Sequence, residues 1–481
     1  FNGLLVVCFV MCCLLDVCWF GIIVALQLET KKRTMRVTRI VLDLVLFFYL
    51  VIGNAAVKSQ EKWTLNQCIS YAVKNNLDVK SNSIQNSVNK ENFYQSKRDL
   101  LPYVSITGSG KKSSGRSLNT ESYEYINTKS TSASIGAYSG IDIFKGFTKR
   151  NTISYKKMTY LSGLEAEKQQ KYDIAFSVMN AYYNAVYYHG LIEIVKEQKE
   201  LSELNLKQTQ KKVNLGLKAK SDLLEMESRL SKEELTLIQT QNNYKTALLD
   251  LKQAMNLIAV DSFSIDFSDQ NVKVIDGVVI TPSEVYTKAL AFYPSIKAKE
   301  LSKDAARKNV AIAKGDLYPS LTMTGGYYSD YYKAKGGSAP SFFDQLKNKT
   351  GQYVSLSLSV PVFQKWGLRS DVKVAKLNYL QSENTYNKAK LELFNEISQN
   401  CQELESYYSE YKQLVSQEKY AGVAFEVAEK KFNQGLISII DMYDSKNVLA
   451  QAKSDLLRTE LLYVIKKKTM DYYMGKPVFE F

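Results

Sequence analysis

The hydrophobic pattern begins as a helix and then changes period. From Trp63 to about Leu101, apolar residues recur at the spacing of an amphipathic helix. Thr64 is placed to cap the N-terminus of this segment, because its hydroxyl can accept from a free backbone N–H. Pro102 ends the pattern, since proline has no N–H to continue a helix. The stretch therefore predicts helical structure up to about Leu101.

Strict alternation follows the proline. Val104 and Ile106 alternate with serine and threonine, and apolar residues between Ala133 and Ile143 alternate with polar, small or aromatic ones. The polar stretch 111–130 separates the two runs. A period of two is typical of strands, because successive side chains point to opposite faces of a sheet. We expect two short strands joined by a long loop.

A much longer helical pattern comes next. Residues 148–214 contain no proline, and their only glycines are Gly163 and Gly190. One helix of ~65 residues would reach ~100 Å, well beyond a globular domain, and two helices end to end are the alternative. After Gly216 an apolar residue recurs every seven positions, which favours coiled-coil packing. The steps are Leu223, Leu230, Leu237, Tyr244, Leu251 and Ile258.

The whole pattern then repeats. Residues 430–449 match residues 211–230 at a constant offset of 219, with Gly216 and Gly435 as one of the identical pairs. Strand-like alternation recurs most cleanly from Val354 to Val360, where serine occupies every second position. Each half therefore reads as helix, strand, loop, strand, long helix, glycine turn and long helix, and an internal repeat is the first feature to fix in any domain assignment.

The repeat sets the expected domains. We predict a first repeat at residues 57–275 and a second at 276–481, each with the order helix-strand-strand-helix-helix. Residues 35–56 have a positive start, a short apolar run and small residues at the end, as in a secretory signal peptide. Residues 1–34 would be an apolar extension upstream of a true start at Met35. The alternative for this extension is a membrane-spanning helix at 4–28.

Composition narrows the chemistry. Lys and Arg number 63 against 49 Asp and Glu, but the charges are interspersed through helical segments, which favours a solvated helix surface over a nucleic-acid site. Beyond the first apolar stretch only Cys68 and Cys401 remain, and whether they pair stays open. The one histidine, His189, lies in an aromatic helix. No metal, phosphate-loop or nucleophile motif is present, so we expect neither an enzyme nor a cofactor.

The strands indicate what the helices are attached to. Each has one apolar face and one face of Ser, Thr, Gly and Tyr. A transmembrane barrel turns the apolar face to lipid and keeps the small polar face for its lumen. Four strands cannot close a conducting barrel, so subunits would share it. Aromatic residues cluster near the strand ends, as an interfacial belt requires; they are Tyr103, Tyr138, Phe144, Tyr318, Tyr327, Tyr328, Tyr331, Tyr332, Tyr353, Phe363 and Trp366.

Several motifs, in duplicated order, carry a family resemblance. D-L-x-P precedes a strand at 99–102 and 316–319, V-P-V-F ends a strand at 360–363, and F-N-x-G-L forms a turn at 432–436. In this order they resemble the TolC-like outer-membrane efflux protein family, the outer-membrane factor of tripartite pumps, over roughly Trp63 to Tyr473.

The resemblance implies an α+β membrane protein, internally duplicated, in which long α-helical coiled-coil hairpins join four β-strands per chain. A homotrimer would form a 12-stranded transmembrane β-barrel. The channel would lie in the outer membrane of a Gram-negative bacterium, in contact with outer-membrane lipid, with a large periplasmic part. Its partners would be a periplasmic adaptor (membrane fusion protein) and an inner-membrane transporter, with no nucleic acid. The cargo would be small molecules in efflux or proteins in type I secretion.

The resemblance also implies site residues. Family members narrow the periplasmic tip with acidic rings, and Asp441 and Asp444 stand at the matching positions, with Asp222 and Glu225 in the first copy. The alternative for each acid is a solvated helix surface or a first-turn charge that complements the helix dipole. The adaptor-contacting tips would be Gly216, Leu217, Gly435 and Leu436.

One departure changes the expected closing contacts. Ile437 stands where some relatives have an arginine that helps to lock the closed tip, so Lys218 or Lys220 would serve instead. The alternative to the channel is a periplasmic coiled-coil interaction protein without a pore, which accounts for the helices but not for the four strands.

Overall fold

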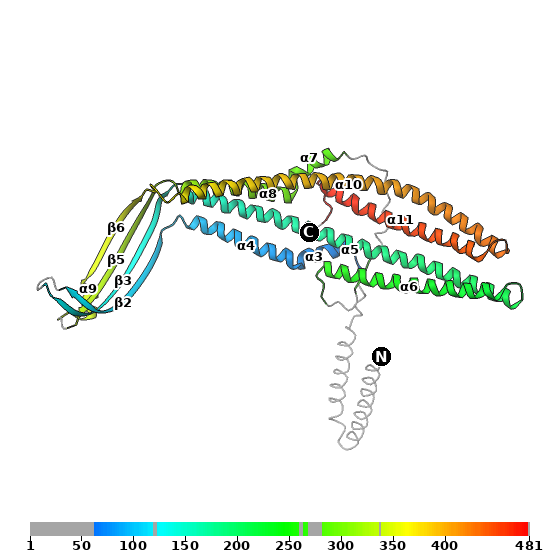
Figure 1. Ribbon diagram of the computed structural model, residues 1–481, viewed down its shortest axis with the longest axis horizontal. Helices are drawn as coiled ribbons and strands as arrows, with labels where there is room; N and C mark the ends of the chain where they lie inside the picture. Colours follow the sequence, from blue (N-terminus) through cyan, green and yellow to red (C-terminus); the bar gives the residue numbers. More distant parts are fainter. Residues whose placement is uncertain (1–61, 119–122, 259–262, 268–280, 336–337, 480–481) are drawn as a thin grey trace, which may run out of the picture. The chain divides into compact units, whose positions relative to one another are not determined.

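The computed structural model describes residues 62–118, 123–258, 263–267, 281–335 and 338–479 (Figure 1). The expected apolar extension, the signal peptide and most of the linker between the repeats lie outside the described residues. Among the helices that are described, none has the length and apolar character needed to cross a membrane.

The helices occur in two matching sets. The first set is α3 (Leu65–Asn75), α4 (Leu77–Arg98), α5 (Thr148–Asn214) and α6 (Lys220–Ala254). The second set is α7 (Pro282–Phe292), α8 (Pro294–Gly315), α10 (Gly367–Asn433) and α11 (Ile439–Tyr473). Corresponding members have identical lengths of 11, 22, 67 and 35 residues. The internal duplication is therefore present in the fold, and residues 148–214 form one continuous helix.

The segment expected to form one helix up to Leu101 is instead two helices. Asn76 leaves the helical region, with φ −64° and ψ 130°, and its side-chain oxygen accepts from the backbone N–H of Asp78 and of Val79. Asn76 thus ends α3 and caps α4. Tyr293 is in the same place in the second set, where the following Pro294 disfavours helical angles for it.

The four long strands form one antiparallel sheet. They are β2 (Tyr103–Leu118), β3 (Tyr125–Lys145), β5 (Ser320–Ala334) and β6 (Thr350–Ser359), in the order β2-β3-β5-β6 (Figure 1). A short helix, α9 (Phe342–Asn348), lies in the connection between β5 and β6. Two short strands, β1 (Lys62–Trp63) and β4 (Ser264–Ile265), pair separately.

The expectation of short strands and a long loop in the first repeat was wrong. β2 and β3 are 16 and 21 residues long and take up most of the polar stretch 111–130. The polar residues pair across the strands: the hydroxyl oxygens of Ser109 and Ser134 are 2.9 Å apart, and those of Ser113 and Ser130 are 2.8 Å apart. Cross-strand hydroxyl pairs stabilise a sheet without apolar side chains.

The two faces of the sheet differ in chemistry. Residues directly opposite each other share a face, so the register places Val104, Ile106, Ile141, Met323, Val354, Leu356 and Leu358 on one face. The opposite face carries the Ser and Thr residues between them. Five tyrosines that were expected in an interfacial belt also lie on this polar face, so the belt assignment is corrected for them. They are Tyr103, Tyr138, Tyr328, Tyr332 and Tyr353.

Glycines explain the position of these tyrosines. A Cβ at Gly140 would lie 2.7 Å from the ring of Tyr103, and one at Gly351 would lie 2.6 Å from the ring of Tyr328. The rings therefore occupy the space that a larger cross-strand neighbour would need. Such aromatic cover compensates for the weak packing of glycine within a strand.

All four helix-to-strand junctions lie at the same end of the sheet (Figure 1). At the β3–α5 junction Gly146 has φ +52°, and a Cβ there would lie 1.9 Å from the carbonyl oxygen of Gly315. Only glycine fits this close backbone approach. Lys149 on α5 pairs with Asp142 on β3 at 3.0 Å, which ties the helix to the strand.

Candidate functional site

Two five-residue turns join the long helices at the end far from the sheet (Figure 1). Gly216 lies between α5 and α6 with φ +72°, and Gly435 lies between α10 and α11 with φ +76°. The N–H of Leu217 donates to the Lys212 carbonyl at 2.8 Å, and the N–H of Gly216 donates to the Val213 carbonyl at 2.9 Å. The second turn makes the same two bonds, so both are Schellman motifs, which place glycine in the left-handed conformation.

Both turns expose leucine. The side chain of Leu217 is 71% exposed and that of Leu436 is 68% exposed. A Cβ added at either glycine would meet no atom within 4 Å. The four residues predicted to contact an adaptor are thus brought together as two open, apolar tips.

The two tips contact each other within one chain. Lys212 donates its Nζ to the carbonyl of Asn433 at 3.1 Å. The Nζ of Lys218 lies 3.7 Å from the centroid of the Phe432 ring. Burial lowers the pKa of the Lys218 ammonium, and nearby Asp222 opposes this shift. Of the two lysines expected in closing contacts, Lys218 thus joins the first turn to the second, while Lys220 is the exposed first residue of α6.

Asp441 and Asp444 are exposed on the first turns of α11. Asp441 also has a local structural role: its Oδ2 accepts from the N–H of Ser438 at 3.2 Å, and the Ser438 Oγ accepts from the N–H of Asp441 at 3.2 Å. This reciprocal pair is a capping box, which satisfies two N–H groups at the start of the helix. A spacing of three residues places both acids on one helix face.

The first-copy acids are less exposed than the second-copy pair. Asp222 and Glu225 are both half-buried on the first turns of α6. Glu225 forms an ion pair with Arg229 at 2.8 Å, which partly neutralises it. Because the two tips contact each other, all four predicted acids lie at a common end of the helices.

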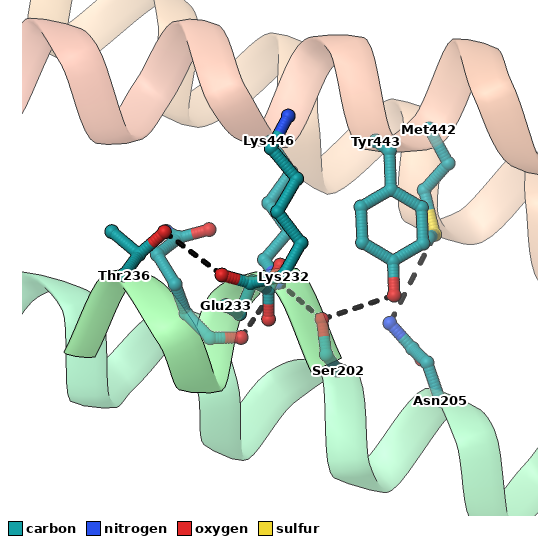
Figure 2. A network of polar contacts seen from close by, with 9 residues as sticks. Ser202, Asn205, Lys232, Glu233, Thr236, Met442, Tyr443 and Lys446 are labelled. Atoms are coloured by element: carbon teal, nitrogen blue, oxygen red, sulfur yellow. Dashed lines mark hydrogen bonds and ion pairs between the residues drawn. The ribbon is translucent and has the colours of Figure 1, made fainter. Parts of the chain in front are cut away.

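A buried lysine near the tips was not found by sequence reasoning. Lys446 on α11 is fully buried and donates to the Gln198 carbonyl at 2.6 Å, to the Ser202 Oγ at 2.5 Å and to the Glu233 Oε1 at 2.8 Å (Figure 2). Burial lowers the pKa of its ammonium, and the Glu233 carboxylate opposes the shift. Its position could have revealed it. Lys446 follows the ladder residue Met442 by four residues, and a coiled coil has its second core residue at that spacing.

The remaining candidate residues are structural. Cys68 and Cys401 are both free thiols, and burial raises the pKa of Cys68 to about 12. The His189 ring stacks on Phe267 with centroids 3.7 Å apart. Across the described ranges, no cluster of His, Cys, Asp and Glu is arranged to hold a metal ion.

Comparison with known families decides the classification. The family described as outer membrane efflux protein matches residues 68–257 and 285–476, one match in each repeat. The chain belongs to this family. The outer membrane protein TolC of Salmonella enteritidis is 21% identical over 420 residues, covering 85% of this chain and 82% of TolC. The probable efflux pump outer membrane protein TtgC of Pseudomonas putida is 22% identical, covering 82% of this chain and 80% of TtgC.

Solved structures agree on the fold. The Campylobacter jejuni CmeC outer membrane channel matches with a TM-score of 0.73 at 18% identity, covering 86% of each chain. The open state of the Neisseria gonorrhoeae MtrE outer membrane channel matches with a TM-score of 0.70 at 16% identity, covering 86% of this chain and 89% of that one. The expected family, the duplicated α+β fold class and the outer-membrane location are thereby confirmed.

Proposed function

We propose that this protein is the exit duct of a tripartite export system, in which three copies form one channel through the outer membrane. The observation that carries the proposal is the sheet, which has one apolar and one polar face and continues at one end into the long helices of both repeats. An isolated sheet of this kind would expose its apolar face to water. A shared barrel turns that face to lipid and the Ser, Thr, Gly and Tyr face to a lumen.

Four strands per chain set the number of copies. A barrel of four strands has no room for a lumen, whereas three chains with four strands each supply twelve. The edge strands of the sheet, β2 and β6, would pair between neighbouring copies, which removes the unpaired backbone groups that lipid cannot satisfy.

The acids then form the entrance. Three copies of Asp441 and Asp444 would surround the axis and create a concentrated negative potential, which attracts cations and raises the energy of the closed ring through repulsion. Asp222 and Glu225 would contribute a second, weaker set, because Glu225 is paired with Arg229. Lys218 on Phe432 supplies one contact that holds the two turns of a chain together.

The exposed tips form the adaptor contact. Leu217 and Leu436 project from turns whose glycines leave the backbone accessible. Apolar side chains on such a turn fit a helical hairpin of a periplasmic adaptor, through which an inner-membrane transporter would be coupled. Efflux is the proposed task, since TtgC is named as a probable efflux pump protein. A protein-exporting transporter on the same adaptor would make it a type I secretion duct.

Planar bilayer recording tests the proposal. Residues 57–481, directed to the outer membrane by a signal peptide and purified in detergent, should give a cation-selective current. Asp441→Asn with Asp444→Asn should lower cation selectivity and weaken block by multivalent cations. The matched control, Asp78→Asn with Glu91→Gln, removes two exposed charges from α4 and should change neither.

The outcomes separate the two parts of the proposal. No current from the unmodified protein contradicts the channel and favours a coiled-coil interaction protein. A current whose selectivity is the same in both double variants keeps the channel and rejects Asp441 and Asp444 as its entrance charges.

A further inference from the structure

The network around Lys446 is where the two repeats differ. At the constant offset of 219, Lys446 corresponds to Glu227 in the first copy, and Glu233 corresponds to Ala452 in the second. Ser202 likewise corresponds to Ala421. Helix lengths, glycine turns and the acid after each turn are duplicated, but this polar cluster is present once. The architecture that the two repeats share does not require this cluster. Its role must therefore be specific to the place where it occurs.

The cluster joins helices of different repeats. Lys446 belongs to α11 in the second repeat, while Ser202 is on α5 and Glu233 on α6 in the first (Figure 2). Tyr443, one turn earlier on α11, adds a hydrogen bond of 3.0 Å between its hydroxyl and that of Ser202. The side chain of Lys446 is 1% exposed, so three hydrogen bonds replace the water it has lost.

A buried ion pair is a poor source of stability. Well-packed apolar residues of similar volume are often as stabilising, whereas removal of one partner leaves a buried charge without compensation. The Oε2 of Glu233 is itself buried without a hydrogen-bond partner. Such a pair, however, strongly restricts how two helices align, because any shift in register or rotation separates the charges. Its contribution is to position rather than to total stability.

The helix that it holds carries the proposed entrance charges. Asp441 and Asp444 precede Lys446 by five and two residues, which at 3.6 residues per turn puts them on the opposite side of α11. The acids are exposed where Lys446 is buried. The rotation of α11 about its axis therefore decides where both acids point.

We propose that Lys446 is a positioning residue that anchors α11 to the α5/α6 hairpin, so that the hairpins of the two repeats move as one unit and Asp441 and Asp444 keep their orientation. This inference rests on the proposed channel function for the role of the acids. Separation of the tips would then occur between copies of the chain, where the corresponding positions are Glu227 and Ala452 and no such ion pair can form.

The same helices provide a matched control. Lys453, two turns further along α11, pairs with Glu197 on α5 at 2.7 Å, and the Glu197 side chain is 61% exposed. The pair links the same two repeats but lies in contact with solvent. Exposed pairs contribute little because water screens them. Lys453→Met therefore removes an inter-repeat ion pair without uncovering a buried charge.

Hydrogen exchange measures the anchor directly. In the purified full protein, Lys446→Met should accelerate backbone exchange in residues 439–450 by at least about tenfold, because a lost buried contact raises local opening. Glu233→Gln should act in the same direction with almost no change in volume. Lys453→Met should match the unmodified protein. Lys446→Arg keeps the positive charge and the N–H donors for Gln198, Ser202 and Glu233, so its exchange should stay slower than that of Lys446→Met. Equal rates in the Lys446→Met and Lys453→Met proteins would overturn the anchor.

Bilayer recording of the same variants tests the positioning of the acids. Lys446→Met should reduce cation selectivity although both acids remain, and Lys446→Arg, which keeps the charge and the donors, should retain more of it. Faster exchange with unchanged selectivity would show that Lys446 does not orient the acids, which overturns the positioning role. Absence of current from the unmodified protein contradicts the channel and that role together, whereas hydrogen exchange still decides whether Lys446 anchors α11.

Discussion

At the two turns, backbone geometry decides which residue type is required more than side-chain contacts do. Gly216 and Gly435 both have positive φ, and a Cβ added at either would meet no atom within 4 Å. The requirement for glycine is therefore conformational, since an L-residue in this region brings its Cβ close to the following carbonyl. Sequence alone indicated these turns, because the glycines interrupt otherwise uniform helical patterns.

The first prediction concerns this requirement. Gly435→Ala should destabilise the protein by about 1 kcal/mol, the cost of a left-handed non-glycine residue. Gly367→Ala is the control: Gly367 begins α10, also has no neighbour within 4 Å, and has no positive φ. Thermal unfolding in detergent measures both. Equal midpoints for the two variants would mean that the turn tolerates alanine and that the glycine is there for another reason.

The second prediction uses the difference between the two helix caps. Ser438 caps α11 with a capping box, while the corresponding Ala219 leaves α6 without a side-chain cap. Ser438→Ala should therefore cost about 1 kcal/mol, and Ala219→Ser should add a similar amount, because Asp222 already occupies the third position needed for the box. Denaturant unfolding of both variants checks the pair. A loss of stability from Ala219→Ser would contradict the equivalence of the two turns.

Among the larger elements, the sheet is defined by the contrast between its faces. Leu356 and Ser357 are neighbours on β6 and point to opposite faces. Leu356→Lys would place a charge in lipid, at a cost of about 2–4 kcal/mol near the bilayer midplane. Ser357→Lys would place the same charge in a lumen. We expect the first variant to be depleted from the outer-membrane fraction and the second to assemble normally, as measured by quantitative immunoblotting.

The opposite result for the two variants would contradict a sheet whose apolar face is turned to lipid. If Ser357→Lys were depleted and Leu356→Lys assembled, the polar face would be the one that lacks water. The apolar face, which would then tolerate a charge, would be the one in contact with water.

The extent of the elements was only partly predictable. The long helices could be predicted from the absence of proline and from the seven-residue ladder. Both signals extend over many residues, so they do not depend on any single position. The strand ends did not, because serine, lysine and glycine between 111 and 130 favour a loop by propensity, and only pairing with β3 makes them a strand. The break at Asn76 was missed for a related reason: in the first repeat a side-chain cap replaces the proline that marks the same break at Pro294.

The candidate site likewise combines residues that local sequence predicts with residues that only tertiary packing brings together. Glycines and acids near the turns were predictable because they act locally, through backbone angles and helix position. The Lys446 cluster was not, since Ser202 and Lys446 are separated by 244 positions and meet only when helices of both repeats pack. The one local sign was a polar residue four positions after the ladder residue Met442, at the second core position of the coiled coil.

For the molecule as a whole, the duplication suggests how the chains assemble. Two matching sets of helices and one sheet of four strands give each chain a repeated unit, and the described sheet ends in two edge strands. Closure of such edges between identical copies follows the general preference of oligomers for closed symmetry. We therefore expect three chains, and no other number, to make one barrel.

Native mass spectrometry of the detergent-extracted protein counts these chains. The mass of the mature chain is first measured under denaturing conditions, which removes any dependence on where the chain is processed. We expect one dominant assembly of three times that mass, contributing twelve long strands from three sheets of four. A monomer, or an assembly with any other number of chains, would contradict the shared barrel.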